Sequence, residues 1–234
     1  MPTEPPPTEW ALSLAQVVPG EDLAGVGADL EPGTVLAAYR IGLFPMGLGE
    51  GGTDPIGWWS PDPRGVLLPG DLHVSRSLRR SLPRFEVRVD TAFEEVVRRC
   101  ADPSRDGRWI TPAIATAYGR LHRLGWAHSV ETWQAGCLVG GLYGLAINGL
   151  FAGESMFHTV TDASKAALVG LVELLGDGGQ PGLPRWMVDV QWRTEHLATL
   201  GIRELPRERY LELLGHVLRQ PAPDAWSHRD AGSP

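Results

Sequence analysis

The stretch CLVGGLYGLAINGLFAGESMF (137–157), preceded by AHSVETW (127–133) and followed by WMVDVQ (186–191), decides the fold. The first short segment and both halves of the long one have the apolar and β-branched content of strands. Asn148-Gly149 separates the halves and is typical of a type I′ hairpin turn, in which both central residues need positive φ. The pattern therefore predicts three antiparallel strands in succession.

A helix and a fourth strand follow these three. Apolar side chains recur at helical spacing between residues 166 and 175, residues 161–164 (TDAS) supply N-cap candidates, and glycines from 176 end the helix. The fourth strand, 186–190, ends near Asp189 and Gln191. These two residues lie two positions apart, so we expect both side chains on the same side of the sheet.

A membrane-spanning helix is the competing interpretation of residues 135–153, which are uncharged and long enough for one. Six of these residues are glycine, and each costs about 0.8–1 kcal/mol relative to alanine in a helix. In a strand, repeated glycine marks a bulge or the close approach of a ligand or another backbone. We therefore favour strands.

Shorter elements are expected on both sides of this stretch. The capping and periodicity signals predict helices over 32–41, 75–80, 93–100, 112–124 and 194–200, a strand over 85–89, and a strand and terminal helix within 203–214. The Gly-rich segment 47–57 and WWSPDPR (58–64) are expected as loops, and the chain from 219 as a loose tail. This order predicts an α+β fold with a central mixed sheet, divided into domains 1–70 and 71–234.

The composition is that of an ordinary globular protein, with 234 residues of which 43% are hydrophobic. The start, MPTEPPPTEW, is acidic and Pro-rich, whereas a secretory signal would be basic and then apolar. Two cysteines, Cys100 and Cys137, do not make a disulfide framework. These features point to the cytoplasm.

Charge is unevenly distributed along the chain. The net charge is −7, yet residues 64–123 hold twelve arginines and seven acidic residues, a local excess of five positive charges. The densest part contains Arg76, Arg79, Arg80 and Arg84. A basic region in an otherwise acidic chain is the electrostatic footprint of a polyanion-binding surface, although solvated helix faces give the same composition.

The order of elements resembles the acyltransferase fold of the N-acetyltransferase superfamily, and eight collinear strings give a closer resemblance. These are AYRIGLFP (38–45), WWSPDPR (58–64), WITP (109–112), LHRLGWAHSVETW (121–133), LVGGLYG (138–144), GESMF (153–157), SK (164–165) and DVQ (189–191). Together they resemble the leucyl/phenylalanyl-tRNA:protein transferases over residues 30–210.

This resemblance implies transfer of Leu, Phe or Met from aminoacyl-tRNA to the α-amino group of proteins beginning with Arg or Lys, which marks them for degradation. It implies no metal, organic cofactor or membrane. Catalytic roles fall on Asp189, Gln191 and Glu154: the family's matching Asp and Gln lie at the reaction centre, and Glu154 is expected to hold the donor's amino group. We expect Asp189 to accept hydrogen bonds from the incoming amine.

The resemblance also assigns binding residues. The donor side-chain pocket is expected to consist of Leu142, Phe151, Gly153, Met156, Leu168, Leu171, Leu175 and Val188. The terminal adenosine of the tRNA is expected against Tyr39, Met46 and Trp109, where Met46 replaces the Trp of the best-known members. Leu171 and Leu175 stand where some members have larger aromatic residues, which leaves the preference between Phe and Leu open.

Two other functions remain open from the sequence. An acetyl-CoA-dependent N-acetyltransferase would need a Gly-rich pyrophosphate loop between the third strand and its helix, and HTVTDAS (158–164) contains no glycine. A non-catalytic RNA-binding protein would use the arginine-rich region but would leave the pair Asp189 and Gln191 unexplained.

Overall fold

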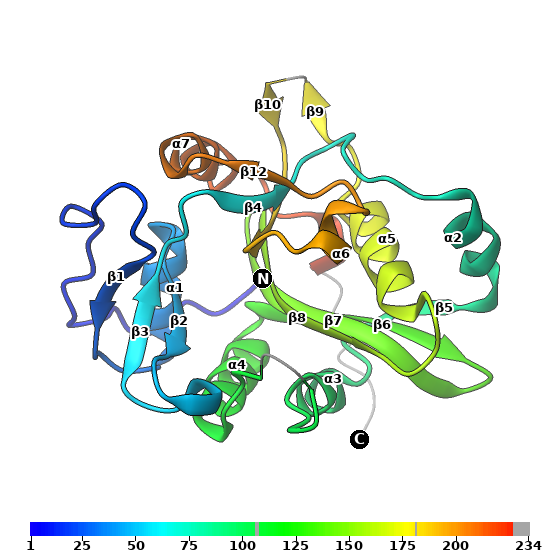
Figure 1. Cartoon of the computed structure of the whole chain (residues 1–234), viewed down its shortest axis with the longest axis horizontal. Coiled ribbons are helices and arrows are strands. Elements are labelled where there is room, and N and C mark those ends of the chain that lie inside the picture. Colours follow the sequence, from blue (N-terminus) through cyan, green and yellow to red (C-terminus); the bar gives the residue numbers. More distant parts are fainter. Residues whose placement is uncertain (106–107, 181, 227–234) are drawn as a thin grey trace.

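A seven-stranded mixed sheet forms the centre of the computed structural model, which describes residues 1–105, 108–180 and 182–226 (Figure 1). The strand order is β12-β4-β11-β8-β7-β6-β5. In chain order the strands are β4 (Arg64–Leu67), β5 (Glu86–Val89), β6 (Ala127–Gln134), β7 (Cys137–Ile147), β8 (Leu150–His158), β11 (Met187–Gln191) and β12 (Arg203–Leu205). Strands β8 and β11 pair in parallel, and their other neighbours pair antiparallel. The three expected strands, the fourth strand and the α+β class are confirmed.

The turn between β7 and β8 differs from the expected type I′ turn. Asn148 has a φ of 54°, but Gly149 lies outside the left-handed region. Gly149 is needed for space instead: a Cβ there would lie 2.2 Å from the carbonyl oxygen of Arg185, and its N–H donates to the carbonyl of Val217. Contacts with distant segments therefore set this turn.

Helices cover both faces of the sheet (Figure 1). One face carries α5 (Ala163–Leu175), and the other carries α3 (Phe93–Cys100) and α4 (Pro112–Leu124). Alternation along β7 explains this: Leu142 packs with the α5 cluster, whereas Tyr143 packs with α3 and α4. The expected N-cap of α4 is confirmed, since Thr111 accepts from Ile114, but the N-cap residue of α5, Asp162, makes no capping bond.

A smaller sheet forms the N-terminal part, with strand order β1-β3-β2. It consists of β1 (Leu23–Val26), β2 (Phe44–Gly47) and β3 (Ile56–Trp59), with α1 (Pro32–Arg40) beside it and η1 (Glu50–Gly52) between β2 and β3. The expected surface loop at Trp58 and Trp59 is wrong, because both residues belong to β3. Trp58 is 2% exposed, and its indole N–H donates to the carbonyl of Gly27 at 2.7 Å. The division at residue 70 stays a prediction; β4, which precedes it, pairs within the large sheet.

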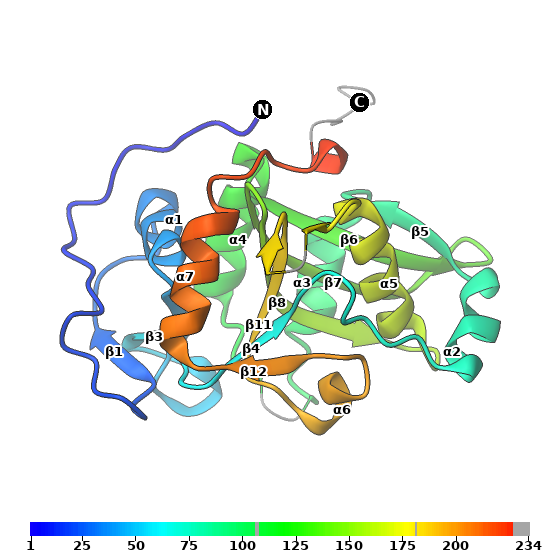
Figure 2. The same cartoon turned by 90° about the horizontal axis from the view of Figure 1, so that it is seen from above.

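The remaining elements lie around the sheet edges. They are α2 (Arg76–Ser81), η2 (Leu82–Arg84), β9 (Gly179–Gln180), β10 (Leu183–Pro184), α6 (Glu195–Ala198), α7 (Arg207–Val217) and η3 (Asp224–Trp226). Figure 2 shows the chain continuing from α7 to η3. The tail expected to be loose from residue 219 therefore contains the short helix η3. The rest of that segment, 227–234, lies outside the described residues. None of the helices in the described part of the chain has the length and apolarity to span a membrane.

Candidate functional site

An apolar cavity of about 310 Å³ lies between β8, α5 and α6. Seven of the eight expected pocket residues line it: Leu142, Phe151, Gly153, Met156, Leu168, Leu171 and Val188. The eighth, Leu175, is the last residue of α5 and packs in the core instead. No sequence signal indicated that α6 would cover this pocket. Thr194, His196 and Leu197 form one wall of it, and Arg105 also lines it. A larger groove of about 960 Å³ beside the N-terminal segment has no buried titratable side chain.

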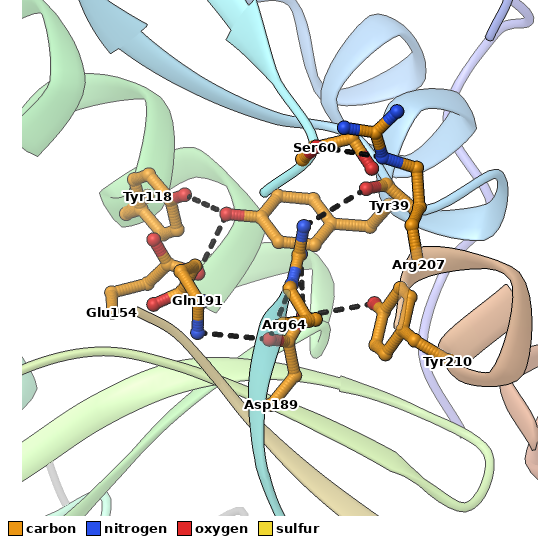
Figure 3. Close-up of polar contacts among 10 residues, drawn as sticks. Tyr39, Ser60, Arg64, Tyr118, Glu154, Asp189, Gln191, Arg207 and Tyr210 are labelled. Carbon is orange, nitrogen blue, oxygen red and sulfur yellow. Dashed lines mark hydrogen bonds and ion pairs between the residues drawn. The ribbon is translucent and has the colours of Figure 1, made fainter. Parts of the chain in front are cut away.

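Glu154 and Gln191 are two of the polar residues that line this cavity. Glu154 is 8% exposed, and the hydroxyl of Tyr39 donates to its Oε1 at 2.6 Å. Tyr39 and Tyr118 are hydrogen-bonded at 2.6 Å, so a Tyr39 that donates to Glu154 accepts from Tyr118 (Figure 3). Burial raises the pKa of Glu154 to about 8, against the lowering effect of the two tyrosine hydroxyls. The carboxyl is therefore mostly neutral at pH 7.

Asp189 is sealed beneath this cavity and does not line it. Arg64 donates to both carboxylate oxygens, from Nε to Oδ1 at 2.8 Å and from Nη2 to Oδ2 at 2.7 Å (Figure 3). The Tyr210 hydroxyl donates to Oδ2 at 2.9 Å, and the backbone N–H of Gln191 donates to Oδ1 at 2.9 Å. Arg64 and Asp189 are each 0% exposed. An incoming amine would have to displace one of these donors to reach Asp189.

Gln191 departs from regular strand geometry. Its φ is 59°, and the register between β11 and β4 shifts between Asp189 and Gln191. The expected placement of both side chains on one side therefore does not hold: Asp189 turns to Arg64, whereas Gln191 lines the cavity. The buried Nε2 of Gln191 has no hydrogen-bond partner among the described residues. This leaves an unused donor at the cavity.

The three residues expected around the adenosine lie in different environments. Met46 and Trp109 are partly buried against the same core cluster, and the backbone of Trp109 packs on Gly52, where a Cβ would lie 2.2 Å from the Trp109 carbonyl oxygen. Tyr39, by contrast, is 1% exposed and has its hydroxyl on Glu154. Tyr39 therefore has no surface to offer a nucleoside.

The arginine-rich region divides into paired and unpaired side chains. Arg76, Arg79, Arg80 and Arg84 are exposed on α2 and η2 and form no ion pair within the described part of the chain. Arg64, counted in the same basic region, is buried against Asp189 and cannot meet a polyanion. Arg98 and Arg99 pair with Glu95, and Arg120 pairs with Glu31. Four exposed arginines without an ion pair among the described residues thus lie together on α2 and η2.

Comparison with known proteins identifies the family. The model of the leucyl/phenylalanyl-tRNA protein transferase family matches residues 66–215, and that of its N-terminal domain matches residues 28–62. The chain belongs to this family. Proteins named leucyl/phenylalanyl-tRNA–protein transferase from Anaeromyxobacter sp. and Aromatoleum aromaticum are 47% and 48% identical to it, over 97% and 95% of this chain and 95% and 90% of theirs. The relative from Syntrophobacter fumaroxidans is 52% identical over 83% of this chain and 82% of its own.

Members of the leucyl/phenylalanyl-tRNA protein transferase family are aminoacyltransferases, and this chain is therefore an aminoacyltransferase. An acetyl-CoA site at the start of α5 is disfavoured by Asp162, whose carboxylate accepts from Ser81 and Lys165 where a pyrophosphate would bind. Across residues 1–105, 108–180 and 182–226, no group of three or more His, Cys, Asp or Glu side chains could hold a metal ion.

The pKa of Glu154 predicts a pH-dependent stability. The folded protein keeps this proton up to about pH 8, whereas the unfolded chain releases it near 4.5, so the native state binds more protons between these values. Stability should therefore fall as pH rises from about 5 to 8, by up to about 1.4 kcal/mol per pH unit. Glu154→Gln, which keeps a neutral side chain, should lack this component.

Urea unfolding of both proteins at several pH values measures this difference. Tyr39→Phe removes a hydrogen bond that favours the carboxylate, so it should extend the pH-dependent range upward. If the free energy of unfolding changed with pH in the same way in the wild type and in Glu154→Gln, the folded protein would not hold the Glu154 proton.

The Arg64–Asp189 pair predicts strong coupling. Arg64→Met or Asp189→Leu alone leaves one buried charge unpaired and should cost about 3–5 kcal/mol of unfolding free energy. The double variant should be less destabilised than the sum of the two. Chemical denaturation checks this, with Arg209→Ala in the exposed Arg209–Glu212 pair as the control, expected to cost under about 1 kcal/mol. Additive losses at Arg64 and Asp189 would contradict the coupling.

Proposed function

We propose that this chain transfers Leu, Phe or Met from aminoacyl-tRNA to the α-amino group of proteins that begin with Arg or Lys, in the cytoplasm, and so marks them for degradation. The observation that carries the proposal is the cavity of about 310 Å³, which is apolar along β8 and α5 and polar at Glu154 and Gln191. Such a cavity suits one uncharged side chain, with its ester held at the polar end.

In this proposal the aminoacyl group of the tRNA is held from two sides. Its side chain enters the apolar part of the cavity, and its amino group meets Glu154, which the hydroxyl of Tyr39 orients. Gln191 lines the cavity, and its Nε2–H, which has no hydrogen-bond partner among the described residues, donates to the ester carbonyl oxygen in this proposal. A hydrogen-bond donor fixed in this place stabilises the negative charge that develops on the carbonyl oxygen when the amine attacks.

The reaction forms a bond between the acceptor nitrogen and the carbonyl carbon and breaks the bond between that carbon and the ribose oxygen. The amine loses one proton, and the departing ribose oxygen gains one. A free α-amino group has a pKa of about 7.7–8.0, so an appreciable minority is neutral at pH 7. Holding both substrates in line is therefore the main task of the protein.

Asp189 has a positioning role in this mechanism, in place of the direct contact with the amine that the resemblance suggests. Its Oδ1 accepts from the backbone N–H of Gln191 at 2.9 Å, where the chain has a φ of 59°. This bond holds a backbone conformation that a residue with a side chain seldom adopts. Asp189, itself fixed by Arg64, thus aims Gln191 into the cavity.

The tRNA is bound by separate surfaces. Trp109 and Met46, at the edge of the N-terminal part, take the terminal adenosine, since an aromatic face suits an unpaired base. Phosphates on the acceptor end meet Arg76, Arg79, Arg80 and Arg84, which are exposed and form no ion pair with any residue that the structure describes.

A transfer assay tests this function. Labelled Leu-tRNA is incubated with the protein and a peptide that begins with Arg, and with matched peptides that begin with Ala or carry an acetylated N-terminus. We expect label only on the peptide with a free N-terminal Arg. Gln191→Ala should lower the turnover number by about a hundred- to a thousandfold, the cost of losing one oxyanion donor, with the affinity for tRNA kept.

Label on every peptide would reject the Arg and Lys preference, and no label on any would reject the transfer itself. Near wild-type turnover by Gln191→Ala would reject the role of Gln191 as hydrogen-bond donor to the ester carbonyl oxygen. Gln191→Ala is preferred to Asp189→Asn because it leaves Arg64 paired.

The arginine surface predicts a salt dependence. The affinity for Leu-tRNA should fall steeply with salt, and replacing Arg76, Arg79, Arg80 or Arg84 singly by Ala should reduce the slope of log affinity against log salt by up to about one unit. Arg203→Ala, on β12 and paired with Asp71, is the control and should leave the slope unchanged. Slopes that do not differ between these variants would place the phosphates elsewhere.

A further inference from the structure

Trp226, in the C-terminal segment, packs beneath the cavity on the α5 side of the sheet. Its ring stacks on Phe151, with centroids 5.6 Å apart and planes inclined by 21°, and on His128, with centroids 4.5 Å apart and planes inclined by 25°. Phe151 lines the cavity and Trp226 does not. Phe151 therefore separates Trp226 from whatever occupies the cavity.

A gap on the sheet makes room for this stack. His128 pairs with Gly144 across β6 and β7, and Phe151 pairs with Ala146 across β7 and β8. A Cβ on Gly144 would lie 2.7 Å from Cε1 of Phe151, so the missing side chain lets the Phe151 ring lie over β7.

The ring of His128, on one side of Trp226, is held by contacts at both of its nitrogens. His128 is 1% exposed, with Nδ1 2.7 Å from Oδ2 of Asp90 and Nε2 3.1 Å from the carbonyl oxygen of Gly125. Contacts at both ring nitrogens hold the His128 ring in place. Trp226 rests on this ring and supports Phe151 next to it.

We propose that Trp226 is a specificity-determining residue that acts through Phe151: it holds the floor of the cavity in place and so limits the size of the donor side chain. The inference rests on the proposed function, in which this cavity takes the donor's side chain. Without Trp226, the Phe151 ring has space to withdraw from the cavity, and the deeper pocket favours the larger side chain.

Packing, and not hydrogen bonding, gives Trp226 this role. Its buried Nε1 has no hydrogen-bond partner among the described residues, so the indole N–H adds nothing to the attachment. A phenylalanine at this place keeps an aromatic face and removes the unsatisfied donor. Trp226→Phe should therefore preserve the pocket, whereas Trp226→Ala should not.

The test compares kcat/KM for Phe-tRNA and Leu-tRNA in variants of the full chain. Trp226→Ala should raise the ratio of Phe to Leu transfer by about three- to tenfold, within the range for a small change of pocket size. Trp226→Phe should keep the wild-type ratio within about twofold. Trp10→Ala is the control for loss of a tryptophan, since Trp10 is 50% exposed and bonded to Asp29, away from the cavity.

An unchanged ratio in a folded Trp226→Ala variant overturns the inference, as does an equal loss for both donors accompanied by a lower melting temperature. Should Trp226→Ala not fold, Trp226→Leu, which keeps apolar bulk without a flat ring, is expected to shift the ratio in the same direction.

Binding of phenylalanine methyl ester and leucine methyl ester examines the same pocket without transfer. The ratio of their dissociation constants should change in Trp226→Ala in the direction that favours phenylalanine. A wild-type protein that transfers neither amino acid would reject the proposed function, while the ester ratio would still decide the role of Trp226.

Discussion

The buried ion pair between Arg64 and Asp189 is the contact on which the rest of the site depends, because it joins the neighbouring strands β4 and β11. Removing two charges from water is expensive, and mutual attraction offsets the cost only when the remaining hydrogen-bonding groups are satisfied. Here Nη1 of Arg64 donates to the carbonyl of Gly42, just after α1, and Tyr210 of α7 donates to Asp189. The pair thus ties the N-terminal part and the C-terminal helix to the strand that presents Gln191.

Two carboxyl groups close to each other are placed in opposite surroundings. Asp189 faces a guanidinium, whereas Glu154 faces the hydroxyls of Tyr39 and Tyr118. Burial without a directly paired cation raises the pKa of Glu154 to about 8. The protein therefore keeps one carboxylate paired with a guanidinium deep in the sheet and one mostly neutral carboxyl group at the cavity surface, a division set by the environment of each carboxyl group.

Local patterns in the sequence predicted most elements of the fold, because capping and periodicity act over a few residues. Thr111 and Gly125 bound α4 as expected, and the strands around Asn148 form the predicted hairpin. Seven of the eight residues that the resemblance assigns to a donor pocket line one cavity, whose role stays a prediction. What escaped depends on contacts between distant residues: Arg64 meets Asp189 across 125 positions, and no spacing rule indicates this. The positive φ of Gln191 and the packing of Trp226 likewise arise from the assembled sheet.

The position of β4 has a consequence for how the chain folds. Both neighbours of β4 in the sheet, β11 and β12, come from much later in the chain. Contacts of such long sequence separation close large loops and are slow to form. Until they form, β4 has two unpaired edges, and Arg64 is a charge that no apolar strand can accept. The arginine that holds Asp189 in the folded protein therefore also disfavours pairing of β4 with an incorrect strand before β11 has formed.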